Sequence, residues 1–292
     1  MADVADRSPR FLKNSDPDYF KAGKNDLITT DQTRSSALRS LILEGAWLSS
    51  ILYTALAVGV LLGIWEVINV ALDVPLWLVP KPSDFILRLF VDYQLIAGHA
   101  WATATTIAMG FALGVVIAVP LAWMIVSIGS LERGLFPVIV FLNIMPKTVI
   151  GPILIVWFGI GPLVSALIVF LMCFFPILVD SMSGFKAIDK RLYYITRSMG
   201  ASDWQAFRYV RVPASMRYIF AGMKIGIVKA AEGVIIAEFI ASNEGLGYMI
   251  MRASGFMDLE LMFSGLIAAA LVALVFNGLI LSAERLLMPW VK

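Results

Sequence analysis

Residues 134–179 have the sequence GLFPVIVFLNIMPKTVIGPILIVWFGIGPLVSALIVFLMCFFPILV, and Lys147 is their only charged residue. A helix that crosses the hydrocarbon core of a bilayer needs about 20 mainly apolar residues, so the stretch has room for two. Glycine and proline disfavour a helix interior, and they occur together at residues 151–152 and again at 159–162. We therefore predict two membrane spans, separated by these glycines and prolines.

Four further stretches on either side can also cross a membrane. Residues 51–72 contain Glu66 as their only charge, and residues 100–131 and 261–283 contain no charge. A fourth stretch, near 218–240, is less apolar. The sequence thus predicts an all-α membrane protein with about six transmembrane helices. The predicted spans lie near residues 51–72, 101–128, 135–156, 162–181, 218–240 and 261–283.

The composition supports a membrane protein and excludes several other classes. Hydrophobic residues make up 60% of the 292 residues and charged residues 15%, whereas soluble domains carry about 25% charge. The mean hydropathy is +0.84. A net charge of +2 gives no reason to expect nucleic-acid binding. One cysteine and one histidine leave no disulfide framework, no metal cluster and no catalytic set for an intramembrane enzyme.

The basic residues predict the orientation. Seven lysines and arginines precede the first span, and seven more lie between the fourth and fifth spans. With six spans these two segments fall on the same side, which the positive-inside rule assigns to the cytoplasm. We therefore expect both termini in the cytoplasm, with residues 1–45 as a polar tail and residues 46–292 as the transmembrane domain.

The loop at residues 186–217 contains signals for two short helices. Asp189 can cap a helix that begins at the next residue, and Gly200 can end it in the left-handed conformation. Ser202 and Gln205 have the spacing of a capping box, which begins a second helix. Pro213 is expected to stop that second helix.

Trp204, Phe207 and Val210 lie at helical spacing on one face of this second helix. Such an elbow can dock into a groove on a partner protein, or it can rest on anionic lipid as an interfacial helix. The residue pattern alone does not separate these two interpretations.

The same loop resembles that of bacterial ABC import permeases. The resemblance rests on RSMGASDW at 197–204, followed by VRVP at 210–213. The wider chain, from about Trp47 onward, resembles the nitrate, sulfonate, taurine and bicarbonate branch of these permeases. The stretches that carry this are PILIVWFGIG at 152–161, FFPIL at 174–178, AEFI at 237–240 and GLGY at 245–248. One departure is Tyr-Ile-Thr at 194–196, where the family usually has Glu-Ala-Ala.

The resemblance implies a type I ABC importer permease fold in a bacterial inner membrane. It implies a second permease copy, with a homodimer expected, a substrate-binding protein outside the cell, and an ABC-type ATPase in the cytoplasm. ATP is then bound by the ATPase, so the chain itself is expected to be no enzyme and to hold no cofactor. The residues expected to couple to the ATPase are Gly200, Ala201, Ser202, Trp204 and Phe207.

Four charged residues in the fifth predicted span need an explanation, because a charge at mid-membrane costs about 2.5–3.5 kcal/mol. They are Lys224, Lys229, Glu232 and Glu238, and with Asn143 of the third span they are the candidates for lining a solute pathway. Lys229 and Glu232 are three residues apart and can pair on a helix. The alternative is a purely structural role for these charges.

The lysines favour a small anionic solute, such as nitrate, bicarbonate, a sulfonate or an organic carboxylate. Two alternatives stay open at this stage. One is a secondary transporter without an ATPase, and the other is an ABC permease for a neutral or cationic nutrient such as a thiamine precursor or a polyamine.

Overall fold

The computed structural model describes residues 52–75, 78–187, 195–196 and 198–290. The predicted tail at 1–45 and the predicted helix start after Asp189 lie outside these residues. The contacts divide the chain into two units, residues 1–65 and 66–292. A helix at Leu52–Ala71 crosses the boundary between them. All the other elements described below belong to the second unit.

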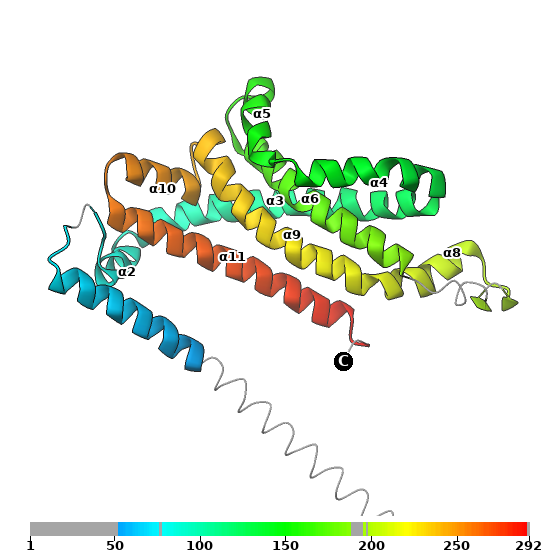
Figure 1. The fold of residues 1–292 in the computed structure, drawn as a ribbon, viewed down its shortest axis with the longest axis horizontal. Coiled ribbons are helices and arrows are strands. Elements are labelled where there is room, and N and C mark those ends of the chain that lie inside the picture. Colours follow the sequence, from blue (N-terminus) through cyan, green and yellow to red (C-terminus); the bar gives the residue numbers. More distant parts are fainter. Residues whose placement is uncertain (1–51, 76–77, 188–194, 197, 291–292) are drawn as a thin grey trace, which may run out of the picture. The chain divides into compact units, whose positions relative to one another are not determined.

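Four long helices run through the second unit: α3 (Tyr93–Ser127), α6 (Pro162–Lys186), α9 (Val212–Ala241) and α11 (Leu259–Leu287) (Figure 1). In the described part of the chain, the helix Leu52–Ala71, α3, α6 and α11 are long and apolar enough to cross a membrane. A bent pair of helices raises the number to five. The fifth predicted span, near 218–240, corresponds to α9, which is long enough but carries more charge. No strand occurs among the described residues, and the all-α membrane fold is confirmed.

The third predicted span is not the single helix expected near 135–156. The chain forms α4 (Gly129–Ile144), then the short 3-10 helix η1 (Lys147–Ile150) and α5 (Gly151–Phe158). The direction changes by 85° between the two parts.

The position of this break has a local cause. Met145 is extended, with ψ at 134°, because the ring of Pro146 disfavours the helical conformation of the residue before it. Pro152 was expected to mark the break but lies in the first turn of α5, where a helix tolerates proline. The second break was correctly predicted, since α5 ends at Phe158 and α6 begins at Pro162.

Two ten-residue helices, α2 (Pro82–Val91) and α10 (Leu246–Gly255), were not predicted. Both are too short to span a bilayer. Both pack against the beginning of α11. The hydroxyl of Ser264 donates to the carbonyl of Phe85 in α2 at 2.8 Å, and the rings of Phe85 and Phe263 stack at 5.6 Å. A Cβ at Gly265 would lie 2.8 Å from the side chain of Ile250 in α10. Both helices lie at the end of the second unit where α11 begins (Figure 1).

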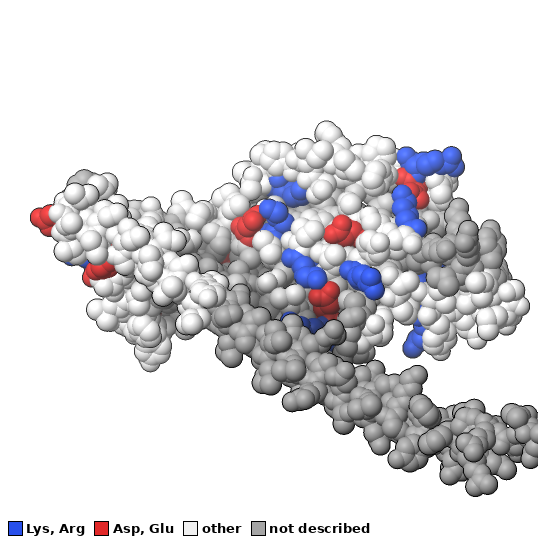
Figure 2. All heavy atoms as spheres, turned by 60° about the horizontal axis from the view of Figure 1, so that its bottom comes forward, with Lys and Arg blue, Asp and Glu red and all other residues white. Residues whose placement is uncertain are grey.

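Small residues bring α3, α6 and α9 close together. A Cβ at Gly110 of α3 would lie 2.6 Å from the Cβ of Val169, and one at Gly226 of α9 would lie 2.8 Å from Ile177. Such close approach is how helices pack in a lipid environment, where apolar side chains gain little from leaving the solvent. On the face shown in Figure 2, most of the described surface belongs to uncharged residues, with basic and acidic side chains side by side.

Candidate functional site

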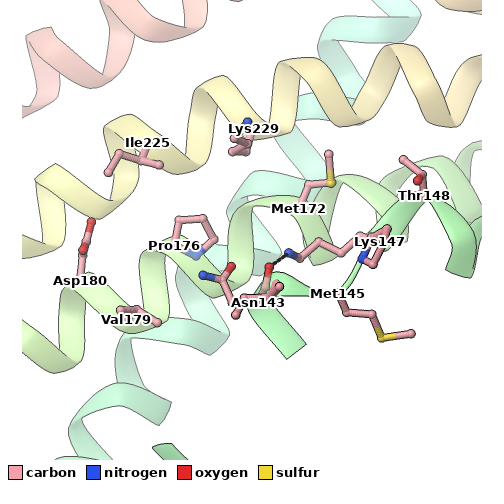
Figure 3. Close-up of a pocket in the computed structure, with 12 residues that line it drawn as sticks. Asn143, Met145, Lys147, Thr148, Met172, Pro176, Val179, Asp180, Ile225 and Lys229 are labelled. Atoms are coloured by element: carbon pink, nitrogen blue, oxygen red, sulfur yellow. Dashed lines mark hydrogen bonds between the residues drawn. The ribbon is translucent and has the colours of Figure 1, made fainter. Parts of the chain in front are cut away.

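A cavity of about 550 Å³ lies between α6, α9 and the break that follows α4 (Figure 3). The cavity exists because the chain changes direction at Pro146. Residues 143–148 therefore form one wall, and the helices α6 and α9 form the other. Twelve residues line it: Asn143, Ile144, Met145, Pro146, Lys147, Thr148, Met172, Pro176, Val179, Asp180, Ile225 and Lys229. Two of the five predicted pathway residues, Asn143 and Lys229, are among them.

Lys147 is the most distinctive group in the cavity. Its ammonium donates to the carbonyl of Asn143 at 2.6 Å and lies 5.2 Å from the centre of the Phe175 ring. It forms no ion pair with any residue in the described part of the chain. In the sequence, Lys147 stands out only as the single charge in a long apolar stretch, and that isolation is the signal of a functional residue.

Lys229 lines the cavity from α9 and pairs with Glu232 at 2.7 Å. The predicted pair is therefore confirmed. Glu232 is half exposed and lies outside the cavity lining. Lys229 thus lines the cavity, whereas the Glu232 carboxylate that compensates its charge lies outside the lining.

Asp180 of α6 also lines the cavity. It was not among the predicted pathway residues, because it falls at the end of the predicted fourth span. Its carboxylate makes no hydrogen bond or ion pair with any described residue. It is the only carboxylate among the lining residues.

Lys224 does not line the cavity. Its ammonium lies 2.8 Å from both carboxylate oxygens of Glu284 and so joins α9 to α11. Both side chains are partly buried. The pair explains this lysine structurally, without a place in the pathway.

Glu238, another predicted pathway residue, also lies outside the cavity lining. Its side chain is 2% exposed. The carboxylate accepts from the hydroxyl of Thr103 at 3.0 Å and from the amide of Gly247 at 2.7 Å. The same threonine oxygen accepts from the amide of Leu246 at 2.8 Å. Glu238 therefore joins α3, α9 and the start of α10.

The turn before α10 closes tightly over this carboxylate. Gly245 has φ at +104°, and a Cβ there would overlap the carboxylate of Glu238. The amide of Gly245 donates to Nδ1 of His99 at 3.2 Å, which makes Nε2 the protonated ring nitrogen of the neutral imidazole. We call Glu238, Thr103, His99 and residues 245–247 the outer network. The sequence GLGY at 245–248 was noted, but its contact with Glu238 was not.

The loop at residues 186–217, which we call the coupling loop after its expected role, follows the predicted local chemistry where it is described. Gly200 has φ at +80°, and the amide of Ala201 donates to the carbonyl of Thr196 at 3.1 Å, as expected for a glycine that ends a helix. The capping box is also confirmed: the amide of Ser202 donates to the side chain of Gln205 at 2.8 Å, and the amide of Gln205 donates back to the serine hydroxyl at 3.2 Å.

Pro213 does not stop the second helix, contrary to the prediction. α8 (Asp203–Ala206) continues through a π-helical turn, η2 (Phe207–Arg211), directly into α9. Pro213 lies in the first turn of α9. A wider π turn accommodates a proline that would clash with the carbonyl four residues earlier in an α-helix.

The two aromatic residues expected to couple to the ATPase, Trp204 and Phe207, have different surroundings. Phe207 is partly buried, with its ring 4.9 Å from that of Trp123 in α3. Trp204 stacks on Phe207 at 5.6 Å but remains 64% exposed. Beside them is a hollow of about 460 Å³ lined by Thr196, Met199, Gly200, Ala201, Gln205 and Tyr209. Phe207 therefore anchors the loop, while Trp204 and the hollow stay available.

Comparison with known proteins identifies the family. The family model described as "binding-protein-dependent transport system inner membrane component" matches residues 110–292. A riboflavin transport system permease of Chloroflexus aurantiacus is 31% identical over 79% of this chain and 87% of its own length. A putative aliphatic sulfonates transport permease of Bacillus subtilis is 28% identical over 84% of this chain and 88% of its own length.

Among solved structures, an inward-facing form of the MetNI methionine ABC transporter matches with a TM-score of 0.59. It covers 66% of this chain and 96% of the matched chain, at 16% identity, and this likeness shows the fold. The sequence relatives and the family model agree with it. The chain belongs to the binding-protein-dependent inner membrane components, and is the permease of an ABC importer.

Proposed function

We propose that the cavity beside Lys147 and Lys229 is part of the pathway of a small solute that carries a negative charge. The observation that supports this most is Lys147, an ammonium that lines the cavity without a carboxylate partner among the described residues. A charged group inside a membrane protein is retained where it has a partner or a function. A solute anion would supply the missing partner.

As a permease of this family the chain is a multi-pass inner-membrane protein and not an enzyme. For the complete importer we propose two copies of the permease, an ATPase on the cytoplasmic side and a substrate-binding protein on the outer side. The exposed Trp204 and the hollow beside Gly200 support docking of the ATPase at the coupling loop. With the ATPase on that side, we expect both termini of the permease in the cytoplasm.

Uptake into proteoliposomes tests the pathway. The purified permease–ATPase complex, with its binding protein, would be supplied with radiolabelled ethanesulfonate as the probe. Lys147→Ala and Lys229→Ala should each lower uptake about tenfold or more while ATP hydrolysis persists. Arg285→Ala, which removes an exposed positive charge at the end of α11, is the matched control. Uptake by both lysine variants at the control's rate would contradict the proposal.

Substitution of Gly200 tests the docking of the loop. A Cβ added at Gly200 meets nothing within 4 Å inside the chain, but a tryptophan would fill the hollow and keep a partner out. Gly200→Trp should therefore lose ATP-driven uptake. The positive φ at this residue strains any side chain, so the amount of folded protein must be measured in parallel. Gly255→Trp, at another position where an added Cβ meets nothing within 4 Å, is the control and should transport normally. Normal uptake by Gly200→Trp would contradict docking of the ATPase at this loop.

A second candidate solute is a neutral heterocycle, favoured by the riboflavin relative and by the apolar part of the lining, Met145, Met172, Pro176 and Ile225. Transport of such a solute should be insensitive to Lys147→Ala. The same variants in the same vesicles therefore distinguish the two candidates.

A further inference from the structure

Asp180 is a charged residue for which neither the fold nor the proposed anion provides a partner. It lies in α6, six residues before the end of the helix, and it lines the same cavity as the two lysines. No described residue donates to its carboxylate. A solute with only negative charge would be repelled by it, so its presence in the lining needs a different explanation.

The carboxylate and the lysines are separated along the cavity. Gly222 of α9 packs directly on Asp180, since a Cβ on this glycine would lie 2.8 Å from that of the aspartate. Lys229 follows seven residues later on the same helix, which corresponds to about 10 Å along the helix axis. In Figure 3 Asp180 and Lys147 lie toward opposite ends of the cavity, with Pro176 between them.

The surface between the charged ends is mainly apolar. Val179, Pro176 and Ile225 line the cavity on the side of Asp180, and Met172 lines it near the lysines. A lining of this kind fits a short hydrocarbon spacer better than a polyhydroxylated one. Charge-assisted hydrogen bonds at each end are about 2.8 Å long, so the lining suits a small solute with one charged group at each end.

We propose that Asp180 is a specificity-determining residue, which favours a solute that carries an ammonium group at the end opposite its negative group. The inference rests on the proposed function of the cavity. Lys147 and Lys229 would hold the anionic end, and Asp180 would accept hydrogen bonds from the ammonium end. A simple anion of the same size would then be bound less well.

Direct binding to the permease–ATPase complex in lipid nanodiscs, without the binding protein, tests this inference. Two probes differ only in the ammonium group: 2-aminoethanesulfonate and ethanesulfonate. The wild-type complex should bind the amino probe about tenfold more tightly. Asp180→Asn should remove this preference, and it should bind ethanesulfonate as well as or better than the wild type, because a repelling charge is gone.

Two further variants separate specificity from a structural effect. Asp180→Glu keeps the charge and should keep the preference for the amino probe. Glu244→Gln removes an exposed carboxylate at the turn after α9 and should leave both affinities unchanged. A merely structural role for Asp180 would weaken both probes together in Asp180→Asn and would overturn the inference.

The remaining outcomes separate this inference from the proposed function. Equal affinity of the wild-type complex for both probes, with both weakened by Lys147→Ala, overturns the role of Asp180 and keeps the anion pathway. Absence of binding by either probe, or unchanged binding in the lysine variants, overturns both.

Discussion

The outer network and the cavity both contain charged side chains between helices, but the surroundings of these charges differ. Glu238 is almost fully buried and accepts hydrogen bonds from Thr103 and from the backbone of α10. Lys147 and Asp180 border open space and have no ion-pair partner among the described residues. A buried charge must be hydrogen-bonded within the protein, whereas a charge in an open cavity can await a ligand. We infer that the first region holds the helices together and the second acts on the solute.

The largest loss of folded protein is expected for Gly245→Ala in the outer network. The substituted residue would have to keep a φ of +104°, and its Cβ would overlap the Glu238 carboxylate. Backbone strain and overpacking together should cost about 3–5 kcal/mol. Size-exclusion chromatography of a fluorescent fusion in detergent would measure the loss. Gly255→Ala, where an added Cβ meets nothing within 4 Å, should yield protein as the wild type does, and equal yields from both variants would show that the turn is not tightly closed.

Glu238→Ala is expected to be the next most damaging change. It leaves the amide of Gly247 and the hydroxyl of Thr103 without their acceptor, which should cost about 2–4 kcal/mol. Thermal unfolding in detergent would report a clearly lower Tm. Glu238→Gln retains one acceptor oxygen and should recover part of the loss. A Tm of Glu238→Ala equal to that of the wild type would contradict the structural role of the network.

The ion pair between Lys224 and Glu284 should contribute less. Both side chains are partly exposed, so a coupling energy of about 0.5–1 kcal/mol is expected. A double-mutant cycle with Lys224→Met and Glu284→Gln, followed by thermal unfolding, isolates this energy. A coupling energy of zero would mean that the contact does not join α9 to α11.

The smallest effect on stability is expected in the cavity, where Asp180→Asn should change the free energy of unfolding by less than about 0.5 kcal/mol. The carboxylate has no partner to lose among the described residues, and asparagine has nearly the same shape. The Tm would be measured beside that of Glu238→Gln. A larger loss in Asp180→Asn than in Glu238→Gln would reverse the contrast between the two regions.

Local signals in the sequence predicted local structure well. The capping box at Ser202 and Gln205, the left-handed Gly200 and the pair of Lys229 with Glu232 all depend on residues within a few positions of one another. The helical spacing that predicted them is set by backbone geometry alone. The number and positions of the apolar stretches likewise follow from the thickness of a bilayer.

Errors arose where a proline had two possible effects. Pro146 breaks the third span, whereas Pro152 and Pro213 lie in the first turns of helices. A proline that ends one helix and a proline that begins the next look alike in sequence. Pro146 was the available signal, because a proline disfavours the helical conformation of the residue before it, but the prediction used only Gly151-Pro152 and residues 159–162 to place the break.

The sequence could not predict which charged residues of α9 line the cavity and which contact other helices. Lys224 meets Glu284 and Glu238 meets Thr103 at separations of 60 and 135 residues. Such partners are decided by how the helices pack, which a helical pattern does not specify. The same holds for Asp180, whose place in the cavity depends on the break after α4.

Chemical modification of a single cysteine tests most directly whether the cavity is the pathway. The rate at which a water-soluble, negatively charged thiol reagent modifies Thr148→Cys would be compared with the rate for Leu246→Cys, which lies buried in the outer network. The native Cys173 is fully buried and should not interfere. We expect rapid modification of Thr148→Cys and loss of uptake, with Leu246→Cys unmodified. Equal rates at the two positions, or full uptake after modification of Thr148→Cys, would contradict it.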